Sequence, residues 1–146
     1  MKQLLAVAFA VLFVAARAWA CSCQTVDDGR SSISIGDDEA VFVGCVVETQ
    51  SISLPQAHGL SDEFRTGAQL VVFDVIKEWK GAPFSRIVVF ADQSNCFFRF
   101  EINREYLVFA RRDGDPAPGA FNVSACSLTA PIADAAGTIK RLPPYP

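Results

Sequence analysis

The chain has two cysteines one residue apart, in Cys21-Ser22-Cys23, directly after an N-terminal apolar stretch. Lys2 gives this stretch a positive start, Leu4–Val14 is its apolar run, and Ala18-Trp19-Ala20 is a small-residue cleavage sequence. These parts in this order are typical of a secretory signal peptide. We therefore predict a signal peptide over residues 1–20. Its removal would make Cys21 the first residue of the exported protein.

Export limits what the cysteines can do, because exported proteins fold where cysteines usually pair. The chain has five cysteines and none lies in the signal segment, so one is left over after pairing. The side chains of Cys21 and Cys23 leave the same face of an extended chain, and a bridge between them would be strained. Each is expected to reach a distant partner among Cys45, Cys96 and Cys126, and the spacing does not choose between these partners.

A structural metal site is the competing interpretation of the cysteines. Cys-x-Cys is not the usual Cys-x-x-Cys spacing of zinc sites, and the chain has one histidine, His58. We therefore expect neither an intrinsic metal nor a cofactor. The common hydrolase, zinc-protease and phosphate-loop motifs do not occur in the sequence, and no pair of carboxylates suggests acid/base chemistry. An enzyme is not expected.

The charge and hydropathy of the chain bear on its partners and its location. The formal net charge is −3, and removal of the signal segment takes away two positive charges and no acid, which gives −5. This balance argues against nucleic acid as a partner. The apolar run is too short to span a bilayer, so no transmembrane segment is expected. We predict a secreted or periplasmic protein. A lipid anchor on Cys21 is less expected, because Ala18 stands where a lipoprotein signal normally has Leu.

Five segments rich in β-branched and aromatic residues are separated by polar links that contain Gly, Pro or Asn. They are Ala40–Glu48, Gly67–Lys80, Phe84–Ala91, Tyr106–Arg111 and Ala120–Ala125. Such segments favour strands, and the short link between the second and third predicts an antiparallel hairpin. Five strands with many turns predict a small β-barrel. We expect one domain over residues 21–140 and a flexible tail over 141–146.

The first of these segments is apolar at successive positions, which predicts that both of its faces are covered. Gly44 within it predicts a bulge or a sharp bend. Asn103 is expected in a tight turn, because asparagine tolerates the left-handed conformation. We predict that one barrel core buries Val41, Val43, Val71, Phe73, Val89, Leu107 and Phe109.

Several short motifs, taken in order, resemble one known family. After Cys21-Ser22-Cys23 come Val41-Phe42-Val43-Gly44, Ile76-Lys77-Glu78-Trp79-Lys80-Gly81, Cys96, Glu105-Tyr106-Leu107-Val108-Phe109-Ala110 and Cys126-Ser127-Leu128-Thr129-Ala130-Pro131. Their order and spacing resemble the inhibitory domain of the tissue inhibitors of metalloproteinases and the related netrin-like modules. The resemblance covers most of the chain after residue 20. The family's second, cysteine-rich domain and one of its bridges have no counterpart here, and the short form looks bacterial.

The resemblance has structural implications. It implies a mainly-β fold, a five-stranded OB-fold-like barrel of the kind that binds oligonucleotides or oligosaccharides in other proteins, with short flanking helices. It also implies the disulfides Cys21–Cys96 and Cys23–Cys126. Cys45 is then left as a free thiol, which we expect to be buried inside the barrel.

The resemblance also implies a secreted inhibitor of zinc metalloendopeptidases. Catalytic zinc keeps an open coordination position, and the α-amine and carbonyl oxygen of Cys21 would chelate the zinc there. The pKa of an unperturbed α-amine is about 7.7–8.0, so its neutral form is accessible near neutral pH. Ser22 would enter the specificity pocket of the protease. The alternative is a non-inhibitory netrin-like binding or scaffold module of the cell envelope. A monomer is expected.

Overall fold

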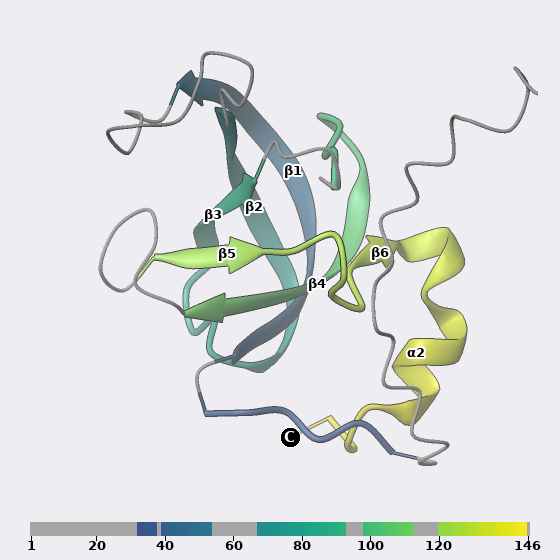
Figure 1. Cartoon of the computed structure of the whole chain (residues 1–146). Coiled ribbons are helices and arrows are strands. Elements are labelled where there is room, and N and C mark those ends of the chain that lie inside the picture. The colour runs from purple at the N-terminus through teal and green to yellow at the C-terminus, as the bar shows by residue number, and fades with distance from the viewer. Residues whose placement is uncertain (1–31, 38, 54–66, 93–97, 113–119, 146) are drawn as a thin grey trace, which may run out of the picture.

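The computed structural model describes residues 32–37, 39–53, 67–92, 98–112 and 120–145. Its elements in chain order are β1 (Glu39–Ser53), β2 (Gly67–Lys80), β3 (Arg86–Asp92), β4 (Glu105–Arg112), β5 (Phe121–Val123), β6 (Ala130–Pro131), the 3-10 turn η2 (Ile132–Asp134) and the helix α2 (Ala136–Arg141). Figure 1 shows the strands wrapped around one another, with α2 beside them next to β6. Among these residues no helix is long and apolar enough to cross a bilayer.

The strands close into a barrel. The sheet order is β1-β2-β3-β5-β4-β6, and β4 also pairs with Glu39–Cys45 of β1, which closes the first five strands into a barrel. The β3–β5 pairing is parallel, and the other pairings are antiparallel. β1 is 15 residues long and bends across the barrel, and its residues Val41–Cys45 pair with β2 along one edge and with β4 along the other. The structure therefore confirms the mainly-β, OB-fold-like five-stranded barrel with a short helix outside it.

Gly44 lies where β1 bends. The β1–β2 register shifts between Val43 and Gly44 and at two further points of β1. A Cβ atom on Gly44 would lie 3.1 Å from the Asp74 carbonyl oxygen and 3.2 Å from the Phe73 Cβ atom. These distances leave almost no room for a side chain, and the predicted bend at Gly44 is confirmed.

Two strand boundaries differ from the sequence prediction by shortening and one by extension: β5 covers only Phe121–Val123 of the predicted Ala120–Ala125, β3 begins at Arg86 instead of Phe84, and β1 is longer. β2 spans the predicted residues, and the antiparallel β2–β3 hairpin is confirmed. β1 continues to Ser53 instead of ending at Glu48, because residues 49–53 pair with residues 67–71 of β2. Asn103 has a φ of 63°, as its turn position predicts.

The apolar core consists of two layers on the two faces of β1 and β4. Successive residues of a strand point to opposite faces, so Phe42 and Val108 enter the barrel while Val41 and Leu107 point outward. The inner layer also holds Val71, Phe73 and Val89. The outer layer is covered by α2 and its flanking residues and consists of Val41, Val43, Leu107, Phe109, Ala135 and Leu142.

The two layers correct one sequence prediction. All seven predicted core residues are buried, and both faces of β1 are covered as expected. A single core is wrong, because four of the seven belong to the outer layer. The alternation of side chains separates two faces without saying which one is the inside of the barrel.

Three of the residues predicted as a flexible tail over 141–146 make contacts with the rest of the fold. Leu142 is buried in the outer layer, and the Arg141 carbonyl oxygen accepts the Ile33 N–H at 2.7 Å. The Tyr145 ring lies edge-on to Trp79, with 6.1 Å between the ring centroids. These residues pack on the barrel because the outer faces of β1 and β4 are apolar and need a cover.

Candidate functional site

The predicted inhibitory segment lies largely outside the described residues. This applies to Cys21, Ser22 and Cys23, and also to Cys96. Cys126 is described and is disulfide-bonded. The pairs Cys21–Cys96 and Cys23–Cys126 stay predictions. The described residues nevertheless give the geometry of three segments next to these cysteines in the sequence.

The first segment is the turn that carries Cys126, between β5 and β6. The Cys126 N–H donates to the Ser124 hydroxyl at 3.1 Å, and the Ser127 N–H donates to the Ser124 carbonyl at 3.0 Å. The Thr129 N–H donates to the Ser127 hydroxyl at 3.3 Å. These local bonds determine the direction in which the turn leaves the sheet.

Thr129 attaches this turn to the barrel. Its side chain is buried, and its hydroxyl accepts the Phe109 N–H at 2.9 Å and donates to the Phe109 carbonyl at 3.3 Å. The Ser127 hydroxyl donates to the Thr129 hydroxyl oxygen at 2.9 Å. The Thr129 hydroxyl thus satisfies the backbone N–H and carbonyl of Phe109, as a neighbouring strand would do. Phe109 lies just beyond the two residues of β4 that pair with β6, Tyr106 and Leu107. The Cys126 turn is therefore held against β4.

The second segment follows Cys96 and consists of residues 98–101. The Gln69 side chain makes two bonds of 3.2 Å to the backbone N–H and carbonyl of Phe100. The Tyr106 ring packs against Phe98 and Phe100, and its hydroxyl accepts the Glu101 N–H at 3.1 Å. This segment is tied to the barrel by both polar and aromatic contacts.

The two segments converge on the start of β4. Tyr106 pairs with Pro131 through the β4–β6 ladder, and its ring contacts Phe98 and Phe100 on the other side. The backbone near Cys96 and the backbone near Cys126 are therefore attached to the same stretch of one strand. Sequence reasoning placed Tyr106 in a strand and did not anticipate this linking role. Its position between two cysteine segments could have suggested it.

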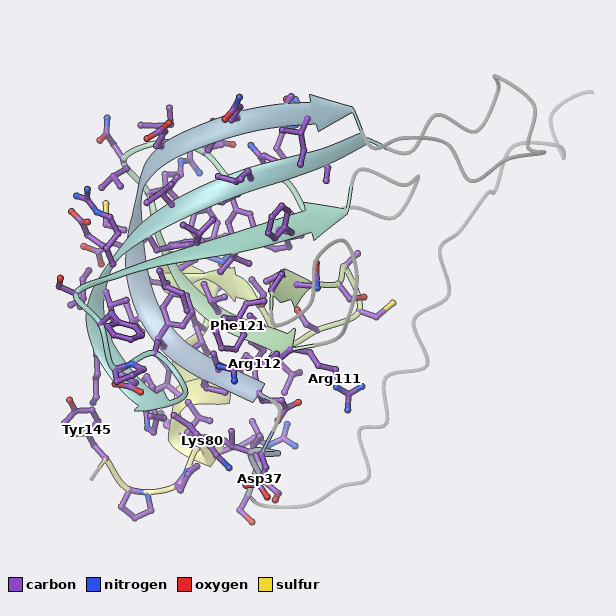
Figure 2. All side chains as sticks on the ribbon, turned by 90° about the vertical axis from the view of Figure 1, so that its left-hand side faces the viewer. Asp37, Lys80, Arg111, Arg112, Phe121 and Tyr145 are labelled. Carbon is purple, nitrogen blue, oxygen red and sulfur yellow. The ribbon has the colours of Figure 1, made fainter. Side chains whose placement is uncertain are left out.

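The third segment, residues 32–37, joins the predicted N-terminal site to β1. The Lys80 ammonium donates to Asp37 at 2.7 Å and to the Ile35 carbonyl at 3.4 Å (Figure 2). The hydrogen bond and charge of Lys80 lower the pKa of the exposed Asp37 carboxyl below its ordinary value. Ile33 and Ile35 pack on the outer core layer. The segment is therefore attached to the barrel just before β1 begins.

The motif from Ile76 to Gly81, which contributes to the family resemblance, has structural roles. The Lys77 ammonium lies 4.8 Å from the centroid of the Trp79 ring, and Trp79 packs on the outer layer. The Glu78 carboxylate accepts the Ala82 N–H at 2.7 Å. Gly81 has a φ of 78°, and a Cβ atom there would lie 2.7 Å from the Glu39 carbonyl oxygen. This motif therefore determines the bend after β2.

Cys45 is a free thiol, and its position corrects the expectation of an interior residue. Its side chain is half-buried and lies on the face of β1 that carries Val41 and Val43, while Val46 enters the barrel. The register shift at Gly44 is in the β1–β2 ladder, so the alternation along β1 still assigns Cys45 to the outer face.

The described residues contain no group of three His, Cys, Asp or Glu side chains that could hold a metal ion. Comparisons with known proteins assign no family: no protein-family model matches the chain, and no curated protein matches it significantly.

Proposed function

We propose that this protein is an exported, non-enzymatic inhibitor of zinc metalloendopeptidases, similar in mechanism to the tissue inhibitors of metalloproteinases. In this proposal residues 1–20 are removed, and the Cys21 amine and carbonyl oxygen chelate the zinc of the protease. Ser22 enters its specificity pocket. The disulfides Cys21–Cys96 and Cys23–Cys126 hold the terminus in place. The resemblance of the sequence motifs is the origin of the proposal.

The attachment of the Cys126 turn to β4 through Thr129 supports the proposal most. A chelating terminus binds tightly only if it is already ordered, because ordering a flexible chain on binding costs free energy. The barrel holds three segments that contain or follow, in the sequence, cysteines of the proposed site: the Cys126 turn, residues 98–101 and residues 32–37. Two disulfides onto such a frame would leave the terminal amine with little freedom.

The chemistry depends on the free amine. A neutral α-amine and the carbonyl oxygen of the same residue form a five-membered chelate with zinc, in the position that a protease keeps open for water. Because only the neutral amine binds metal, inhibition should strengthen as pH rises through the amine pKa, which is about 7.7–8.0 in short peptides.

The test is an inhibition constant against a panel of zinc endopeptidases, with two variants of the terminus. One variant has an alanine before Cys21, which moves the amine away from the metal. The other has the Cys21 amine acetylated, which adds no residue and delocalises the nitrogen lone pair into an amide, so that it no longer binds a metal. Both should lose inhibition and keep the thermal unfolding midpoint of the unmodified protein. Equal inhibition by all three forms would refute chelation.

The alternative is a non-inhibitory netrin-like module of the cell envelope. It is favoured by the finding that Glu78, Trp79 and Gly81 of this motif are engaged in bending and packing the barrel. On this alternative Cys21 and Cys23 only attach the chain terminus. If the unmodified protein inhibits no member of the panel, the alternative becomes the better proposal. A change of Ser22 to Arg separates the two further, because it should alter selectivity among proteases only in an inhibitor.

A further inference from the structure

The outer face of the β2–β3 hairpin exposes large apolar side chains. Val71, Phe73, Ile87 and Val89 point into the barrel, so the residues between them along each strand point outward. Three large apolar residues of this hairpin stay exposed: Ile76 (57%), Phe84 (70%) and Val88 (43%). The ribbons of β1, β2 and β3 run side by side in Figure 2. Apolar residues gathered on one face mark an interaction surface.

An ion pair lies in the middle of this face. Asp74 and Arg86 are cross-strand neighbours, with 2.7 Å between the Arg86 Nε and Asp74 Oδ1 atoms. Their side chains are 47% and 62% exposed, so both charges remain available to a partner. On one side of the pair Val72 lies opposite Val88. On the other side the Val75 N–H donates to the Ser85 carbonyl at 2.8 Å, and the same register carried one residue further would bring Ile76 opposite Phe84.

We propose that this face binds a second copy of the chain, around a two-fold axis that runs parallel to the strands between β2 and β3. Such a rotation lays β2 on β3 of the second copy, so each residue faces the partner's copy of its own cross-strand neighbour. Asp74 then faces the partner subunit's Arg86, and Ile76 faces the partner subunit's Phe84. The two-fold symmetry repeats each contact.

The arrangement of the charges favours a second copy of this chain as the partner, and it favours one orientation of the two-fold axis. A two-fold axis through the same centre but perpendicular to the strands would place Asp74 against Asp74 and Arg86 against Arg86, which is repulsive. With the axis parallel to the strands, four charges alternate in sign at the centre, and apolar pairs lie on both sides. Two sheets packed in this way are aligned, as in a β-sandwich. The apolar side chains supply the affinity, and the ion pairs determine the geometry.

This inference departs from the monomer expected from the sequence. The proposed dimer face contains no residue of the proposed inhibitory segment, so a failure of one proposal does not refute the other. The experiment measures mass by sedimentation equilibrium, over a range of concentrations, on purified protein free of intermolecular disulfides. The unchanged protein should reach twice the mass of one chain as its concentration rises.

Charge reversals test the arrangement. Asp74→Arg and Arg86→Asp, each alone, put like charges at both central contacts, and each variant should have the mass of a single chain. An equal mixture of the two variants should restore the doubled mass, because one chain then presents only arginines and the other only aspartates at the centre. The double variant Asp74→Arg/Arg86→Asp should also form a dimer. These side chains are exposed, so the unfolding midpoint of the separate chains should change little.

Glu101→Arg is the matched control. Glu101 belongs to another exposed ion pair, with Arg104 at 2.9 Å, and the reversal changes the net charge equally. This variant should stay a dimer. The proposal is overturned if the unchanged protein keeps the mass of one chain at every concentration. It is also overturned if mixing the two single variants fails to restore the doubled mass, or if Glu101→Arg abolishes the dimer as well.

Discussion

A change of Thr129 to Val tests whether one hydroxyl holds the Cys126 turn on the barrel. The hydroxyl accepts the Phe109 N–H at 2.9 Å and donates to the Phe109 carbonyl at 3.3 Å, and Thr129 is only 7% exposed. Valine has nearly the same shape and can make neither bond. Leaving a buried polar group unsatisfied costs about 1–3 kcal/mol. Because the second bond is long, we expect the free energy of unfolding to fall by about 2–3 kcal/mol in total.

The assay is urea unfolding without added oxidant or reductant, so that the bond of Cys126 stays intact. The midpoint should fall while the slope with urea stays the same, since the surface exposed on unfolding does not change. Thr129→Ser is the matched control, because it keeps the hydroxyl and loses one methyl group, which costs about 1 kcal/mol. The reasoning is refuted if Thr129→Val is as stable as the unchanged protein, or if Thr129→Ser is the less stable of the two variants.

Three further changes test the frame around the site. Gly81→Ala should lower stability by about 1–3 kcal/mol in chemical denaturation, because it forces a side chain into a left-handed backbone and against the Glu39 carbonyl oxygen. Phe109→Ala should cost about 3–5 kcal/mol in the same assay, since it empties part of the buried outer layer, and an unchanged midpoint would argue against that burial. Lys80→Ala should raise the pKa of Asp37 in an NMR titration back toward 3.8. The pair therefore stabilises the fold above that pH and stops doing so as pH falls through the lowered pKa; an unmoved titration would show that Lys80 is not the cause.

The sequence alone was enough for most of the local structure. It predicted β2 over Gly67–Lys80, the hairpin with β3, the bend at Gly44 and the left-handed turn at Asn103. Each of these depends on a property of neighbouring residues: alternation along a strand, the lack of a Cβ atom, or tolerance of a positive φ. Such properties act over a few residues, so they are visible without a partner.

For the candidate site, the sequence predicted which residues take part but not how they are attached to the barrel. The motif Cys21-Ser22-Cys23 and the later cysteines suggest the chemistry, while the attachments made by Thr129 and Tyr106 appear only in the folded chain. A buried threonine hydroxyl has no local signature, because its partner, Phe109, lies 20 residues away in the sequence.

Tertiary structure decided which apolar residues lie inside the barrel and which lie under α2. β1 and β4 are apolar on both faces, so their alternation separates Phe42 from Val41 without saying which of them points inward. It also decided that Cys45 lies on the outer face and that Leu142 packs instead of extending into solvent. Burial is a relation between segments far apart in the chain, and it is settled only when the barrel closes and leaves an apolar outer face for the C-terminal helix to cover.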